Sequence, residues 1–391
     1  MKRFIKIIGH GVLGLLALIL VAVLISALSN IGLPQESTVV VRLSAPQKAY
    51  LAEAFHLRRE LGDAVWSGWG AAEIPIIVYN EAYAFLVNYP GEPPVGWRTV
   101  PGGEQQGNVW EIVPDDTFDG EPYYRSALPE SGETPQAFTV RLGDVWVASL
   151  GTHEAMRIGL VEGLRKDLPA PLDALVPYRL VLRLLLGTGD QYVAALLHES
   201  LHAYQGLTAP ERLRAGENVL RQISDYPAQE DAHVELWKEE LVLLRDALRA
   251  ETEADAAELA QQFLAQRDRR RTQIDARFVR YERHREWVEG LAKYTEMEIW
   301  RQAAIADEYA PVDALSDVRA FRAYETFDRH RSQQVDQIAR MAGNEGDGRF
   351  YYSGMAQAFL LDQLAPGWKA RIMQDDVFLE DLLREAVARD Q

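Results

Sequence analysis

The sequence predicts an α+β protein in which a small, mostly antiparallel sheet precedes a largely helical part. Residues 34–150 contain short runs of β-branched and aromatic residues, separated by turns rich in glycine, proline and aspartate. From Thr152 onward, apolar residues recur three and four positions apart, which is the helical period. Residues 1–31 contain a long apolar run, which we expect to form a separate helix.

The composition excludes some functions. The chain has 391 residues, of which 48% are hydrophobic, and this suffices for one large or two medium-sized domains. A formal net charge of -17 argues against a nucleic-acid partner, because such a partner requires Lys and Arg opposite its phosphates. There is no cysteine, so disulfides, thiolate metal ligands and a cysteine nucleophile are excluded. Any metal must therefore bind to histidine and carboxylate side chains.

The N-terminus predicts a membrane anchor. Basic residues at positions 2, 3 and 6 precede an apolar run from Ile7 to Leu28, and about 20 apolar residues span a bilayer as a helix. The basic flank should stay in the cytoplasm, which places the rest of the chain on the periplasmic side. A cleaved signal peptide is the alternative, since Ala27-Leu28-Ser29 offers suitable small residues. The length of the apolar run favours a retained transmembrane signal-anchor over residues 1–31.

Residues 32–150 form the predicted α+β lobe. A helix is expected from Ala45 to Trp66, where apolar and charged residues fall on opposite sides. Gly143-Asp144 separates two alternating runs and predicts a tight hairpin. Strands are expected at residues 38–43, 74–79, 109–113, 122–128, 138–142 and 145–150.

Residues 151–391 form the predicted helical domain, and residues 208–285 within it are rich in charge and helical in period. The helix expected from Gln191 to Gln205 is apolar nearly all round, which predicts burial, and Gly206 is placed to end it. A basic cluster lies at Arg267 and residues 269–271. It is either a solvated helix face paired with nearby glutamates, or a docking patch for an acidic partner or lipid head groups.

The stretch from Leu197 to Tyr204 carries the chemistry. It reads His-Glu-x-x-His, with His198 and His202 four positions apart and Glu199 beside the first. Histidines at this spacing share one helix face and can chelate a single zinc ion, while the glutamate can act as general base toward a water on the metal. Burial strengthens this interpretation, because buried His and Glu side chains need partners and a metal ion is one.

A second stretch, Arg285 to Glu296, supplies carboxylates for the third ligand that a catalytic zinc needs. His-Glu-x-x-His followed by Glu-Gly-Leu-Ala-x-Tyr-x-Glu resembles the gluzincin metallopeptidases, the group that contains thermolysin and the aminopeptidase-N-like enzymes. This resemblance implies Glu289 as the third ligand. Glu286 and Glu296 are the alternatives, and Glu296 is better suited to accept a hydrogen bond from a ligand histidine.

The resemblance also implies a zincin-like domain. Residues 203–288 separate His202 from Glu289, where well-known members have a much shorter spacer, so residues 208–285 would be a helical insertion. A third match lies at residues 350–356 (FYYSGMA). It resembles the Tyr-x-x-Gly-Ala of the aminopeptidase-N-like enzymes and implies that Tyr351 stabilises the oxyanion, with Tyr352 as the alternative. The other histidines, His153, His233, His284 and His330, lack paired spacing and are expected to be structural or exposed.

Together these features predict a membrane-anchored zinc metallopeptidase on the periplasmic side, with Zn²⁺ as cofactor and a peptide or protein as substrate. One alternative is a zinc hydrolase with a non-peptide substrate. Another is a non-catalytic helical adaptor that retains a zincin fold, although Glu199 argues against it because a structural site has no use for a base. The sequence does not indicate an oligomeric state.

Overall fold

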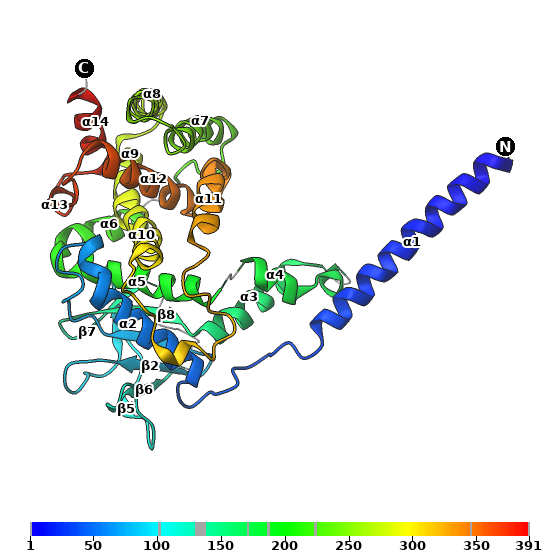
Figure 1. Cartoon of the computed structure of the whole chain (residues 1–391), viewed down its shortest axis with the longest axis horizontal. Helices are drawn as coiled ribbons and strands as arrows, with labels where there is room; N and C mark the ends of the chain where they lie inside the picture. The colour runs from blue at the N-terminus through cyan, green and yellow to red at the C-terminus, as the bar shows by residue number, and fades with distance from the viewer. Residues whose placement is uncertain are drawn as a thin grey trace.

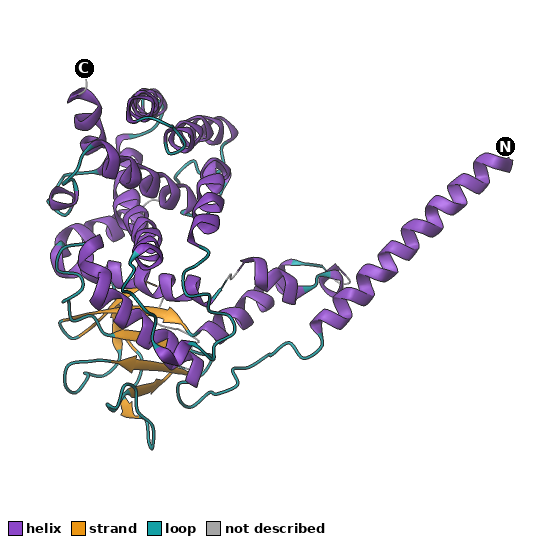
Figure 2. Ribbon diagram, viewed as in Figure 1, coloured by secondary structure: helices purple, strands orange, loops and turns teal. Residues whose placement is uncertain are grey.

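The computed structural model describes residues 2–100, 103–129, 138–169, 172–185, 188–222, 225–344 and 346–389. The structure is α+β, in agreement with the predicted class. A curled sheet forms one end of the molecule, and helices are stacked above it (Figures 1 and 2). Helix α5 (Gly189–Thr208) packs on strand β8 (Val145–Gly151), and α10 (Leu291–Ile305) packs on α5. This stacking places the helix with the His-Glu-x-x-His motif between the sheet and the remaining helices.

The sheet has eight strands in the order β4-β3-β7-β8-β1-β2-β6-β5. Among these strands β1 and β8 run parallel and the other neighbours run antiparallel, so the sheet is mostly antiparallel, as predicted. The strands before β8 are β1 (Ile76–Tyr79), β2 (Tyr83–Val87), β3 (Trp97–Thr99), β4 (Gln105–Gln106), β5 (Glu111–Ile112), β6 (Tyr124–Ala127) and β7 (Phe138–Leu142).

The predicted hairpin at residues 138–150 is confirmed. Strands β7 and β8 pair antiparallel, with Leu142 opposite Val145. The turn requires a positive φ, and Gly143 adopts φ 57° there. Strand β1 is buried on both faces: Ile76 and Val78 contact the core under the helices, while Ile77 contacts a second cluster that contains Trp97 and Trp110. Two buried faces explain why this strand is apolar throughout rather than alternating.

The predicted strand at residues 38–43 is wrong, because side chains satisfy this segment's backbone. Asn80 Nδ2 donates to the Val40 carbonyl at 2.9 Å, and Arg125 Nη1 donates to the Val41 carbonyl at 2.8 Å. Three strands were not predicted: β2, which forms antiparallel pairs with both β1 and β6, and the short strands β3 and β4. A β-branched run therefore became a loop, since strand formation depends on neighbours more than on composition.

Most of the described chain outside the sheet and its loops is helical, and the segment 208–285 is helical as predicted. It contains α6 (Pro210–Gln222), α7 (Asp231–Ala247), α8 (Glu253–Arg271) and α9 (Ala276–Arg285), and a π-helical turn, η2 (Glu286–Gly290), joins α9 to α10. The other α-helices are α1 (Lys2–Asn30), α2 (Ala45–Val65), α3 (His153–Asp167), α4 (Tyr178–Leu185), α11 (Phe327–Gln337), α12 (Gly348–Leu364), α13 (Lys369–Ile372) and α14 (Leu379–Arg389), with short 3₁₀ segments η1 (Leu172–Leu175), η3 (Asp313–Leu315) and η4 (Ile338–Gly343).

The predicted transmembrane helix is not supported. Among the described residues, no helix combines the length and the apolar character needed to cross a membrane. Helix α1 projects from the body (Figure 1), but the end of the predicted span is polar and packs on η1 and α4. Ser26 is buried, and Asn30 donates to the Val176 carbonyl at 2.9 Å and accepts from the Tyr178 N–H at 3.0 Å. The prediction of a membrane anchor is therefore wrong, and the periplasmic location that depended on the anchor has no support.

One hydrophobic core crosses the predicted domain boundary near residue 150. Helix α2, from the N-terminal side, packs on both α5 and α10 from the C-terminal side. Leu51 and Leu57 of α2 share one cluster with Leu197 and Leu201 of α5. The division into residues 32–150 and 151–391 stays a prediction, but the sheet and the helices form a single support for the site.

Candidate metal centre

Helix α5 is held at its start and near its end. At the start, the Gln191 side chain accepts from the Thr188 N–H at 3.2 Å, and Asp190 accepts from the N–H groups of Arg322 and Tyr324. Near the end, Gly206 does not terminate the helix as expected. A Cβ at this position would lie 2.4 Å from Trp146 Cδ2, so glycine is required for close packing against β8. The helix therefore continues past the motif to Thr208.

The turn η2 brings the second motif to α5. The close approach of η2 to α12 depends on two glycines: a Cβ on Gly354 would lie 2.6 Å from both Gly290 Cα and the Glu286 carbonyl oxygen. Glu289 precedes Gly290, and Tyr351 lies about one turn before Gly354 on α12. The crossing therefore brings the carboxylate of Glu289 and the ring of Tyr351 to the same side of α5.

The three predicted metal ligands come together. His198 Nε2 and His202 Nε2 each lie 3.5 Å from Glu289 Oε2. One ligand atom from each residue fits within a 4.8 Å span, and all three side chains are buried. We refer to His198, His202 and Glu289 as the candidate metal centre. The structure thus joins residues that are far apart in the sequence.

Each ligand of the candidate metal centre is held by a neighbour. Gln205 donates through Nε2 to the Trp287 carbonyl at 2.9 Å, which turns its Oε1 toward His202 Nδ1 at 3.0 Å. Because Oε1 only accepts, the His202 proton lies on Nδ1 and the Nε2 lone pair faces Glu289. Glu296 lies 3.6 Å from His198 Nδ1 and plays the corresponding role there.

Arg285 holds the carboxylate ligand. Its Nη2 donates to Glu289 Oε1 at 2.7 Å and to Asp347 at 2.6 Å, while its Nη1 donates to Glu217 at 3.0 Å. Glu289 Oε1 is thereby occupied, and Oε2 is directed at the histidines. The sequence analysis missed both Gln205 and Arg285. Their positions, three after His202 and four before Glu289, are the helical spacings that place a side chain beside a ligand.

These residues fit a metal ion. Glu289 Oε2 is buried and has no hydrogen-bond partner, although it faces two imidazole nitrogens. Glu199 Oε2 is also buried without a hydrogen-bond partner. Buried carboxylate oxygens are costly unless a hydrogen bond or a cation compensates them. Two neutral imidazole nitrogens and one carboxylate oxygen form one of the standard ligand sets for zinc.

The electrostatics of the site favour a positive charge at its centre. Burial lowers the pKa of His198, but the carboxylates of Glu289 and Glu296 outweigh it and raise this pKa to about 10. Burial raises the pKa of Glu199 to about 8, and the neighbouring carboxylates Glu289 and Glu296 act in the same direction. A cation between these groups relieves the repulsion among the carboxylates, and a proton or a metal ion can supply it.

The structure separates the two tyrosine candidates. The ring of Tyr351 stacks on the His198 imidazole, with centroids 5.6 Å apart and an interplanar angle of 15°. Burial and the Glu289 carboxylate raise the pKa of its hydroxyl well above 10, which keeps it protonated. The Tyr352 hydroxyl instead donates to Gln334 at 2.7 Å. Of the other carboxylates considered, Glu286 pairs with Arg267 and does not reach the histidines.

Comparisons with protein-family models, with curated proteins and with solved structures found no match. The likeness to gluzincins therefore rests on the motif residues alone.

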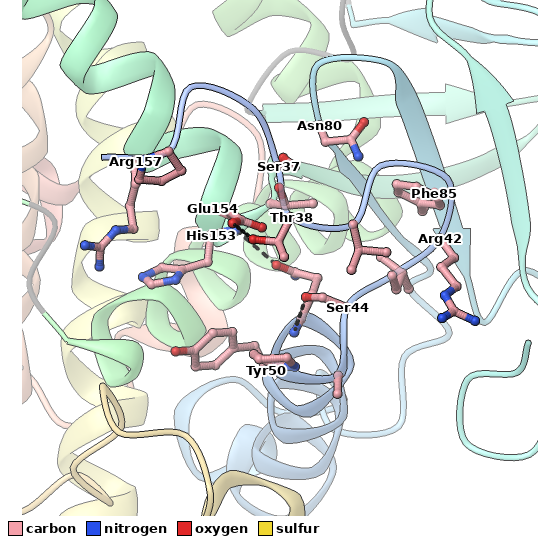
Figure 3. A pocket seen from close by; sticks show the side chains of 17 residues that line it. Ser37, Thr38, Arg42, Ser44, Tyr50, Asn80, Phe85, His153, Glu154 and Arg157 are labelled. Atoms are coloured by element: carbon pink, nitrogen blue, oxygen red, sulfur yellow. Dashed lines mark hydrogen bonds between the residues drawn. The ribbon is translucent and has the colours of Figure 1, made fainter. Parts of the chain in front are cut away.

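A separate cavity of about 480 Å³ lies between the start of α2, the start of α3 and the segment 34–44 (Figure 3). None of the residues of the candidate metal centre is among the described residues that line it. His153 lines this cavity and packs edge-on against Tyr50 and Tyr192, with centroids 5.2 and 5.1 Å away. These contacts match the structural role expected for His153.

Proposed function

We propose that the chain is a zinc-dependent metallopeptidase in which His198, His202 and Glu289 bind the metal ion. The observation that carries this proposal is the convergence of two Nε2 atoms on a buried Glu289 Oε2 that has no hydrogen-bond partner. A buried carboxylate oxygen without a hydrogen bond is costly, and a cation at this position would compensate its charge. The ligand types, imidazole and carboxylate, support zinc.

Three protein ligands leave a position open for water, which is the arrangement of catalytic zinc sites. When bound, zinc supplies a Lewis acid that lowers the pKa of a water molecule and polarises a carbonyl group. The protein side chains then have two tasks: they move a proton, and they stabilise charge on the oxygen of the attacked carbonyl.

Glu199 is the general base of this proposal. Its buried carboxylate accepts a proton from the attacking water and returns it to the leaving nitrogen, so no net proton is consumed. Tyr351 is the donor to the oxyanion, because its hydroxyl keeps its proton and its ring lies against His198. The reaction class is the hydrolysis of an amide bond, with a peptide as the substrate.

The alternative of a non-catalytic adaptor receives no support from these contacts. A structural zinc site is closed by four ligands, whereas three candidate ligands come together here. Glu199 Oε2 has no hydrogen-bond partner, which favours a general base over a carboxylate with a structural role.

The substitution Glu199→Gln tests the proposal. We expect the wild-type chain to bind one equivalent of zinc and to cleave members of a peptide library. The Glu199→Gln variant should retain zinc and lose at least about 100-fold in kcat, since it lacks the base. Zinc is measured by elemental analysis, and cleavage by mass spectrometry.

His202→Ala is the matched control, because it removes a ligand and leaves the base. It should lose the zinc. Full activity of the Glu199→Gln variant, or a wild-type chain without zinc affinity, would contradict the proposal. A zinc-loaded chain that cleaves no peptide would instead favour the non-peptide hydrolase.

A further inference from the structure

In the basic cluster on α8, Arg267 and Arg270 are buried among carboxylates, while Arg271 is partly buried and Arg269 is exposed. The predicted pairing with glutamates is confirmed, but the face that carries Arg267 and Arg270 is not solvated. Arg267 and Arg270 are 0% exposed. Helices α7, α9 and α14 and the turn η2 supply the carboxylates around them, which excludes both a solvated face and a docking patch at these two arginines. We name this group the charge cluster; it consists of Arg267, Arg270, Arg271, Glu240, Glu282, Glu286 and Glu380.

Arg267 connects the charge cluster to the elements that carry the site. Its Nη1 and Nη2 donate to the two oxygens of Glu286 at 2.9 and 2.6 Å, and Nη2 also donates to Ser353 Oγ at 2.8 Å. Ser353 Oγ in turn donates to Glu286 Oε1 at 2.6 Å. Arg267, Glu286 and Ser353 are all buried, and they are linked by a ring of mutual hydrogen bonds.

These partners lie next to the site in the sequence. Glu286 begins the turn η2, three residues before Glu289, and Ser353 is two residues after Tyr351 on α12. A π-helical turn is an uncommon conformation that is often found at functional sites. By bonding to both elements, one guanidinium fixes the turn with the third ligand relative to the helix with the tyrosine.

Arg270 provides a comparison within the same cluster. It is as buried as Arg267, and it packs over the same indole ring, that of Trp237. Its carboxylate partners are Glu240 on α7 and Glu282 on α9. Within the described chain, its side-chain hydrogen bonds go to these two carboxylates, which lie on neither η2 nor α12. The two arginines thus differ in what they hold rather than in burial or charge.

We propose that Arg267 is a positioning residue for the candidate metal centre, and that the helical insertion 208–285 serves to deliver it. This inference rests on the proposed zinc function. The desolvation cost of burying an ion pair can cancel its electrostatic gain, so the buried pair is weak evidence that Arg267 stabilises the fold. We therefore assign Arg267 a positioning role. Its bidentate geometry with Glu286 restricts the turn that carries Glu289.

The test compares Arg267→Met with Arg270→Met in the full chain. Both variants remove a buried guanidinium, so a general loss of stability should affect both. Zinc dissociation constants are measured by competition with a chromophoric chelator. We expect Arg267→Met to weaken zinc binding by about 10- to 100-fold, which is the usual effect of losing a group that orients a ligand, and Arg270→Met to stay within about threefold of the wild type.

A second readout reports geometry. The visible absorption spectrum of the Co²⁺-loaded protein depends on ligand arrangement, so it should change in Arg267→Met and not in Arg270→Met. Equal losses of affinity in the two variants, or an unchanged affinity and spectrum in Arg267→Met, would overturn the inference while the proposed function stands. A wild-type chain that binds no zinc would instead contradict the proposed function, and the inference with it.

If Arg267→Met does not fold, as judged by circular dichroism, Ser353→Ala replaces it. This variant removes a single hydroxyl that bridges Arg267 and Glu286. It should weaken zinc binding in the same direction and to a smaller extent. An affinity equal to that of the wild type in a folded Ser353→Ala variant would count against the positioning role.

Discussion

At the residue scale, the orientation of two of the candidate ligands, His202 and Glu289, depends on a side chain outside the motifs. Gln205 fixes which nitrogen of His202 faces the centre, and Arg285 occupies the oxygen of Glu289 that faces away. Such neighbours commonly contribute one to two orders of magnitude in metal affinity. They do so by reducing the number of arrangements that the ligands can adopt before the ion binds.

The two adjacent tyrosines allow a matched test of oxyanion stabilisation. Tyr351→Phe removes a hydroxyl that faces Glu289 beside His198, and Tyr352→Phe removes one that donates to Gln334. Loss of an oxyanion donor typically lowers kcat by about 100- to 1000-fold, so we expect this range for Tyr351→Phe with zinc content unchanged. Tyr352→Phe should have a kcat close to that of the wild type. Steady-state kinetics on one cleaved peptide would decide, and equal rates in the two variants would exclude the role of Tyr351.

Sequence reasoning reached the residues whose chemistry follows from local spacing. His198 and His202 share a helix face whatever the tertiary structure is, so the pair could be predicted. Glu289 could be placed only through its resemblance to a known motif, because residues 203–288 intervene. The charge cluster was misread because runs of arginine are usually solvated. A buried guanidinium needs carboxylates from other helices, and these cannot be identified without the fold.

At the scale of elements, the crossing of η2 with α12 determines how close the two motifs approach. Gly290 and Gly354 face each other, and no side chain separates the two backbones. Glycine costs conformational entropy in a helix, and here that cost permits contact between the backbones. The crossing explains why each motif contains a glycine at this place.

Gly354→Ala should separate these elements. The added Cβ would lie 2.6 Å from the Glu286 carbonyl oxygen and from Gly290 Cα, so backbone must move. We expect a loss of about 1–3 kcal/mol in the free energy of unfolding, as is usual for overpacking, together with weaker zinc binding. Gly163→Ala on α3 is the control, since nothing lies within 4 Å of its added Cβ. There a gain of up to about 1 kcal/mol is expected from helix propensity. Chemical denaturation measures both, and a stable Gly354→Ala variant with normal zinc affinity would contradict this account.

The strands show where prediction from sequence fails at this scale. The hairpin β7–β8 was predicted correctly because its turn and its alternation are local features. The segment 38–43 has the composition of a strand, yet the side chains of Asn80 and Arg125 bond to two of its carbonyls in place of a neighbouring strand. Whether a side chain or a neighbouring strand bonds to a backbone carbonyl depends on the tertiary structure. The amino-acid composition of the segment does not reveal it.

At the scale of the whole molecule, four histidines that are buried or partly buried make stability depend on pH. Burial lowers the pKa of His153, His233, His284 and His330 to about 4 in each case, while an unfolded chain has a histidine pKa of about 6.5. Between these values the unfolded chain binds more protons than the folded one. The free energy of unfolding should therefore fall as the pH is lowered from about 7 to 4.

Thermal unfolding across this pH range measures the effect, with a chelator present so that release of metal does not contribute. We expect the midpoint temperature to decrease steadily below about pH 6.5. The variant His153→Gln should show a shallower decrease, because one titrating group is absent. A midpoint that is constant between pH 7 and 5 would show that these imidazoles titrate normally in the folded protein.

The apolar N-terminal run shows a limit of prediction for the whole molecule. Length and hydropathy alone suggested a membrane span. At the end of α1, Asn30 bonds to the backbone of Val176 and Tyr178 and donates to Ser26 Oγ. Contacts of this range, across more than a third of the chain, are set by the fold and have no local signature.

The pairing of Glu380 with two buried arginines has a consequence for the order of folding. This carboxylate pairs with both Arg267 and Arg271, and it lies on α14, the last helix of the described chain. Until α14 packs against α8, the buried guanidinium groups of Arg267 and Arg271 lack this acceptor. The docking of α14 therefore completes the hydrogen bonding behind the third ligand, so we expect the helices on both sides of η2 to fold together.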